Sequence, residues 1–114
     1  MKWYVDGSGF NGSESKFCAA NENGESFVQK FNSNRSNNEM EYEALLCALN
    51  KCSKGDLIYS DSQLVINQVL GNWKTKKNHL FPLMLRAHTL LVEKDVKLEY
   101  LQRDKNLAGN LLEK

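Results

Sequence analysis

Three acidic residues occupy positions where a carboxylate is costly to bury. Asp6 closes an alternating segment, residues 3–6, that predicts a β-strand delivering the acid to its end. Glu41 falls on the apolar stripe of a predicted helix when that stripe is traced back by four residues. Asp61 directly follows residues 56–60, a short apolar run typical of a buried parallel strand. An acid in such surroundings needs a compensating cation.

The three acids converge if the strands that end near Asp6 and Asp61 are neighbours, because ligands gather at the carboxyl ends of strands in such sheets. Clustered anions cannot all stay ionised without a counter-charge. Oxygen-only ligands favour a hard divalent cation such as Mg²⁺ or Mn²⁺. Sites of this kind, often with two metal ions, activate water for in-line displacement at phosphorus. The pattern therefore indicates a possible metal site at Asp6, Glu41 and Asp61.

Each acid also has a simpler interpretation when it is taken alone. Asp61 could be the N-cap of the next helix. Asp6 could bond its own loop, and Glu41 could pair with a lysine or an arginine. Three such coincidences on separate elements are harder to accept than one shared site.

The elements that position these acids follow from the periodicity of the chain. Strands are predicted at residues 3–6, 15–20, 26–31, 56–60 and 96–101, and helices at residues 38–52, 62–70, 80–93 and 106–114. The order β-β-β-α-β-α-α-β-α predicts an α/β fold with a mixed sheet: an antiparallel meander first, then strands entering by right-handed crossovers. In the last helix, Leu107 and either Leu111 or Leu112 are expected to face inward. The length of 114 residues predicts a single domain, residues 1–114.

The bulk composition excludes few classes of function. The formal net charge is +1, so the chain has no global basic field of the kind many nucleic-acid binders carry. One local basic segment, residues 72–79, carries Trp73 and Lys74. A tryptophan among lysines suits stacking on a sugar while phosphates are neutralised. The alternative is a solvated loop with Trp73 packed on the core.

The sequence also predicts where the protein resides. No apolar run reaches the length needed to span a bilayer, and the first strand starts too early to leave room for a signal peptide. Three cysteines without CxxC spacing, Cys18, Cys47 and Cys52, predict reduced thiols rather than disulfides or a zinc site. We therefore expect a cytoplasmic monomer with no membrane association and no evident protein partner.

Three blocks of the sequence carry a family resemblance. Residues 4–8, 36–45 and 59–65 resemble, in order and spacing, the signature blocks of type 1 ribonuclease H. The resemblance covers nearly the whole chain. It implies a five-stranded mixed sheet flanked by helices. It also implies endonucleolytic cleavage of the RNA strand of an RNA–DNA hybrid, with two Mg²⁺ (or Mn²⁺) ions.

The resemblance assigns roles residue by residue. Asp6, Glu41 and Asp61 match three of the family's four catalytic, metal-binding carboxylates. Four polar residues match positions that touch the hybrid, and two further residues match a loop that approaches the substrate backbone: Asn37, Asn38, Ser62 and Gln63, then Gly7 and Ser8. Short amides and hydroxyls can distinguish RNA from DNA through the 2′-hydroxyl. Asn37 and Asn38 could instead be turn residues.

The final block departs from the family pattern. Residues 103–110 place Asn110 where the family has its fourth catalytic, metal-binding carboxylate. The amide can still act as a metal ligand but adds no charge, so we expect a higher metal requirement or a preference for Mn²⁺. Glu113, one helical turn further on, is a conceivable substitute. The alternative functions are a weakened or inactive nucleic-acid-binding module of the same fold, and another nuclease of the superfamily.

Overall fold

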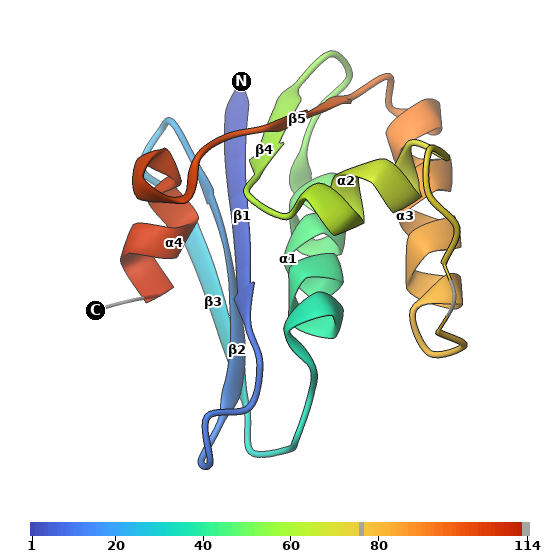
Figure 1. The fold of residues 1–114 in the computed structure, drawn as a ribbon. Coiled ribbons are helices and arrows are strands. Elements are labelled where there is room, and N and C mark those ends of the chain that lie inside the picture. Colours follow the sequence, from blue (N-terminus) through green and yellow to red (C-terminus); the bar gives the residue numbers. More distant parts are fainter. Residues whose placement is uncertain (76, 113–114) are drawn as a thin grey trace.

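The computed structural model describes residues 1–75 and 77–112, and in this part of the chain one mixed sheet has the strand order β3-β2-β1-β4-β5 (Figure 1). The elements are β1 (Lys2–Ser8), β2 (Ser15–Asn21), β3 (Ser26–Phe31), α1 (Asn37–Lys51), β4 (Leu57–Ser60), α2 (Gln63–Val69), α3 (Phe81–Glu93), β5 (Lys97–Tyr100), the short 3₁₀ helix η1 (Arg103–Lys105) and α4 (Leu107–Leu112). The predicted order of strands and α-helices is confirmed. None of the described helices is long and apolar enough to cross a membrane.

The two halves of the sheet pair differently, as predicted. Strands β1, β2 and β3 form the antiparallel meander, whereas β4 pairs parallel to both β1 and β5. Figure 1 shows α1 and α3 on one face of the sheet and α4 on the other. Because β1 lies in the middle, it contacts the sheet on both sides and a helix on each face. Residues 3–5 of β1, directly before Asp6, are therefore paired on both edges of the strand.

Helix α1 provides most of the core on its face. Its N-cap is Ser36, whose hydroxyl accepts a hydrogen bond from the Glu39 N–H at 3.1 Å. The stripe Ala44, Leu45, Ala48 and Leu49 is fully buried. Glu41, one turn earlier, is only 8% exposed. The predicted position of an acid on the core side of this helix is therefore confirmed.

The prediction that β1 ends at Asp6 is wrong. β1 continues to Ser8, which pairs with Lys16 of β2, while its parallel pairing with β4 stops at Val5 opposite Ser60. The antiparallel ladder holds the strand straight through a sequence that resembles a turn. Asp6 consequently lies in a rigid strand, one residue beyond the point where β1 and β4 separate.

The prediction for the inward face of α4 is confirmed for Leu112 and wrong for Leu107. Leu107 is 37% exposed, whereas Ala108 and Leu112 are buried against Cys18 and Ala20 of β2. The side of α4 that faces the sheet is set at the start of the helix, where the Asn106 side chain accepts a hydrogen bond from the Ala108 N–H at 3.1 Å. That arrangement points residues 108 and 112 inward. Glu113 lies outside the described residues.

A buried carboxylate closes the other end of the sheet. Asp56 accepts hydrogen bonds from the Ser53 N–H at 2.8 Å, the Met1 ammonium at 3.1 Å and the Trp3 indole at 3.2 Å. Burial alone would raise the pKa of Asp56, but these donors lower it below its ordinary value. The ionised form is therefore stabilised in the folded protein.

Asp56→Asn is expected to lower the free energy of unfolding by about 1–2 kcal/mol at pH 7. Because folding lowers the pKa of Asp56, its contribution is fully present above the unfolded value of about 3.9 and is lost as the pH falls through the folded value. Urea unfolding of both proteins should show the difference narrowing from pH 7 toward pH 3. A difference that stays constant over this range would contradict the assignment.

Candidate active site

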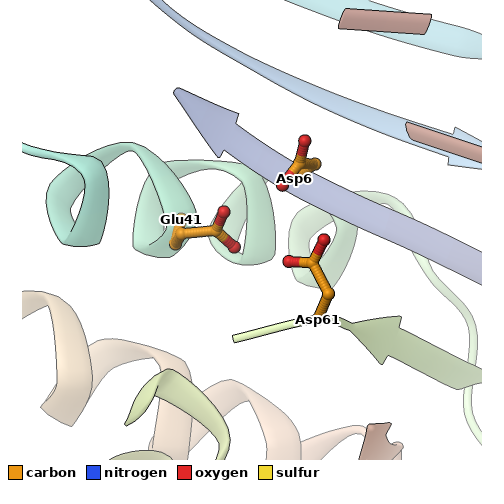
Figure 2. A group of neighbouring side chains, drawn as sticks. All are labelled: Asp6, Glu41 and Asp61. Atoms are coloured by element: carbon orange, nitrogen blue, oxygen red, sulfur yellow. The ribbon is translucent and has the colours of Figure 1, made fainter. Parts of the chain in front are cut away.

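Three carboxylates from three elements meet at one end of the sheet (Figure 2). One oxygen from each of Asp6, Glu41 and Asp61 lies within 4.8 Å of the other two. Figure 2 shows the side chains pointing toward one another from β1, α1 and the residue that follows β4. The structure thus brings together the three acids that the sequence singled out, and we call them the acid cluster.

The separation of β1 and β4 makes room for this cluster. β4 ends at Ser60, and the chain turns at once into α2. Ser62, not Asp61, caps that helix, with its hydroxyl accepting from the Val65 N–H at 3.2 Å. The interpretation of Asp61 as an N-cap is therefore wrong, and its half-buried carboxylate is left to face Asp6.

Glu41 is held in place by a close contact between α1 and β1. The Gly7 N–H donates to Glu41 Oε1 at 2.9 Å. A Cβ on Gly7 would lie 2.2 Å from the carbonyl carbon of Met40, so only glycine permits this approach. The sequence predicts that Gly7 gives a ligand access to the backbone, which stays a prediction. The structure shows a different reason for glycine, because the backbone of α1 fills the space where a side chain of residue 7 would lie.

The other oxygen of Glu41 has no such support. Glu41 Oε2 is buried and has no hydrogen-bond partner among the described residues. Burial raises the pKa of Glu41, and Asp6 and Asp61 raise it further, against a smaller lowering by the Gly7 N–H. Burial and Asp6 likewise raise the pKa of Asp61, opposed by Arg103 and Asn106. An unpartnered buried oxygen among like charges and oxygen-only donors fits a hard divalent cation.

An open cavity of about 640 Å³ lies over the acid cluster. Five of the predicted substrate-binding residues line it together with the three acids: Gly7, Ser8, Asn37, Asn38 and Ser62. Gln63, at the exposed start of α2, and Asn110, exposed on α4, are not among the described residues that line it. The carboxamide of Asn37 also accepts a hydrogen bond from the Gly9 N–H, which fixes the loop after β1.

Trp73 and Lys74 lie beside a second cavity, of about 560 Å³. Trp73 is 49% exposed, so the interpretation that packs it on the core is wrong. Asn38 lines this cavity as well as the one over the acid cluster. Apart from Gln63, which lines neither cavity, the predicted substrate-binding residues therefore fall into two groups that share Asn38.

Several residues near the acid cluster were not predicted as site residues. Lys16 and Tyr100 line its cavity from strand positions opposite Ser8 and Ser60, a register that the sequence does not reveal. Lys16 Nζ also donates to the Leu112 carbonyl oxygen at 2.9 Å.

The final block of the sequence contains two more such residues. Arg103 lines the cavity, and the fully buried Asn106 donates to the Val5 carbonyl oxygen at 2.9 Å, directly before Asp6. Their membership of that block was the signal that could have found them.

Comparison with known proteins gives a consistent result. The family model described as RNase H matches residues 1–110. The N-terminal RNase H domain of Mycobacterium tuberculosis rv2228c superposes with a TM-score of 0.80 at 22% identity, covering 98% of this chain and 92% of that one. RNase H1 from Halobacterium salinarum NRC-1 gives 0.78 at 25% identity, with 97% and 92% covered. LC11-RNase H1, solved in complex with an RNA/DNA hybrid, gives 0.80 at 22% identity, with 97% and 91% covered. With the family match spanning nearly its whole length and the same fold in these structures, this chain belongs to the RNase H family.

Proposed function

We propose that this protein is an endoribonuclease that hydrolyses the RNA strand of RNA–DNA hybrids with two Mg²⁺ or Mn²⁺ ions. The observation that carries the proposal is the acid cluster, with its unpartnered buried Glu41 oxygen, at the base of a cavity lined by short amides and hydroxyls. Membership of the RNase H family supports it. The hybrid bound to LC11-RNase H1 supports the choice of substrate.

The acid cluster would hold the ions, with the Asn110 amide as a weaker fourth ligand. Bound there, divalent ions supply a Lewis acid for water activation and charge stabilisation at the reacting phosphate. The chain's own contribution is preorganisation. Asp6 is fixed by its pairing with Cys18 of β2, directly after the last residue of β1 that pairs with β4. Glu41 Oε1 is occupied by the Gly7 N–H, which leaves Oε2 available to a ligand.

The polar groups around the acids would bind the substrate. Asn38 and Ser62, which line the cavity, can exchange hydrogen bonds with 2′-hydroxyls in a shallow minor groove. We assign the same role to Ser8, Asn37 and Gln63. Trp73 and Lys74 would bind the neighbouring backbone by stacking and charge.

The second candidate function is a module that binds hybrids without cutting them. The observation that favours it is Asn110, which is neutral and exposed on α4. Loss of one anionic ligand weakens affinity for a divalent ion. Three intact carboxylates favour the nuclease.

A cleavage assay decides between the two. The purified protein is incubated with end-labelled RNA–DNA, RNA–RNA and DNA–DNA duplexes in Mg²⁺ and in Mn²⁺. We expect internal cuts in the RNA strand of the hybrid and none in the other duplexes. An intact hybrid under both metals, together with a measurable shift in its mobility, would establish the binding module instead.

Asn110→Asp is expected to lower the metal concentration that gives half-maximal cleavage by at least about threefold, because it restores an anionic ligand. The measurement is initial rate against Mg²⁺ and Mn²⁺ concentration. Asn50→Asp is the matched control, since it makes the same charge change at an exposed position near the far end of α1. If both variants keep the wild-type metal dependence, Asn110 is not a ligand.

A further inference from the structure

The first two residues of the basic segment, Asn72 and Trp73, are attached to α2. The backbone N–H groups of Asn72 and Trp73 both donate to the Asn67 carbonyl oxygen, at 2.8 and 3.1 Å. The Asn72 side chain donates to the Asn67 side chain at 3.2 Å. These bonds set where the segment leaves α2. They do not connect it to the acid cluster.

A buried pair of polar side chains makes that connection. Tyr42 follows Glu41 in α1 and is fully buried. Its hydroxyl donates to Gln68 Oε1 at 2.7 Å, and Gln68 Nε2 faces the Lys74 carbonyl oxygen at 3.5 Å. A chain of hydrogen bonds thus runs from the residue beside Glu41 to the backbone of the basic segment.

Packing alone does not require this polar pair. A phenylalanine and a methionine would fill nearly the same space, and apolar replacement of both partners of a buried hydrogen bond is close to neutral for stability. Gln68 is 6% exposed and lines the cavity beside Trp73 and Lys74. The pair therefore links the residue that follows Glu41 in α1 to the backbone of Lys74.

We propose that Tyr42 and Gln68 are positioning residues that hold Trp73 and Lys74 at a fixed place relative to the acid cluster. A strand bound by the basic segment is then already aligned when a phosphate of the hybrid reaches Asp6. This inference rests on the proposed function. The hydrogen bonds of Tyr42 and Gln68 would favour binding by preorganisation, because a segment ordered before the substrate arrives loses less entropy on binding.

The double variant Tyr42→Phe/Gln68→Met tests the proposal, since each single change would leave one buried polar group unpaired. We expect the hybrid KM, and the Kd measured in a chelator, to rise about 3- to 10-fold. We expect kcat to stay within about twofold, because the acid cluster is untouched. The salt dependence of the hybrid binding constant should become weaker by about the contribution of one phosphate contact.

Fluorescence reports the position of the segment directly. The chain has two tryptophans, so Trp3→Phe leaves Trp73 as the sole tryptophan, whose emission can be excited selectively. In that background, acrylamide should quench Trp73 more strongly in the double variant. Trp3→Phe is also the matched control, because it removes a buried hydrogen bond, Trp3 to Asp56, at the far end of the sheet. Its KM should equal that of the wild type.

Unchanged quenching, or an unchanged Kd, in the double variant overturns the positioning role even in an active enzyme. Equal losses in the double variant and in Trp3→Phe also overturn it, because they indicate general destabilisation. A wild type that binds hybrid without cutting it contradicts the proposed function. The positioning role is then decided by the Kd of the double variant compared with that of the wild type. A wild type that neither binds nor cuts overturns both.

Discussion

Asp6→Asn is expected to reduce the rate of hybrid cleavage by at least about 10³-fold at saturating metal, because in the proposed function Asp6 is an anionic ligand shared by the ions. Asp6 is the central member of the acid cluster: it raises the pKa of both Glu41 and Asp61. Removal of its charge therefore weakens the field at every point where an ion would lie. The measurement is the single-turnover cleavage rate, with enzyme in excess over labelled hybrid.

The same substitution should leave the protein folded or make it more stable. Asp6 is 7% exposed, and its charge opposes those of its neighbours in the absence of an ion. An amide at this position should remove the part of the rise in the Glu41 pKa that comes from Asp6, whereas the part that comes from burial remains. The urea midpoint without divalent ions should be equal to or above that of the wild type. A midpoint at or above that of the wild type would show that a loss of activity does not come from unfolding.

Asp95→Asn is the matched control for this experiment. Asp95 is exposed in the turn between α3 and β5 and has a φ of 53°, a conformation that asparagine tolerates well. The substitution makes the same chemical change far from the acid cluster, and the Asp95→Asn protein should cleave the hybrid at the wild-type rate. An Asp6→Asn protein that kept more than about a tenth of the activity would show that the acid cluster is not the metal site.

The convergence of the acids could be predicted because each one obeys a local rule. Strand alternation places Asp6, the four-residue step of a helix places Glu41, and the end of a short apolar strand places Asp61. Each rule acts over a few residues. The mixed sheet then brings the three together, since β4 pairs with β1 directly beside Asp6.

What could not be predicted depends on partners that are distant in sequence. Gly7 and Ser8 have the composition of a turn, but pairing with Phe17 and Lys16 keeps them in β1. In the short helix α4, apolar residues at 107, 108, 111 and 112 fit more than one inward face, and the bond to Asn106 selects one. Tyr42 lies among the buried residues of α1, and its position in the sequence does not indicate that its hydroxyl bonds to Gln68, 26 residues away.

Substrate contacts were the least predictable part of the site. Gln63 is adjacent to Ser62 in sequence, yet only Ser62 is among the described residues that line the cavity over the acids. Adjacent residues at a helix start point in different directions, so a match to a block does not place every side chain. The roles of all the predicted site residues, Gln63 and Asn110 included, stay predictions that binding and metal titrations test.

Gly7→Ala is expected to lower the free energy of unfolding by at least about 3 kcal/mol, because the added methyl group has no space. Its Cβ would lie 2.2 Å from the Met40 carbonyl carbon, 2.4 Å from the Glu41 nitrogen and 2.5 Å from the Met40 oxygen. All three are backbone atoms of α1, so no side chain can move aside. Either α1 must shift away from β1 or the strand must bend.

Gly12→Ala separates this contact from the general effect of replacing a glycine. Gly12 has a φ of 100° but open space around its Cβ position, so its cost should be limited to backbone strain of about 1–2 kcal/mol. Gly7 is not among the glycines with positive φ, so its larger cost must come from contact with α1. Urea unfolding of both variants measures the difference. Equal costs would mean that α1 and β1 can separate freely, and the Gly7 N–H would then not be what fixes Glu41 in the acid cluster.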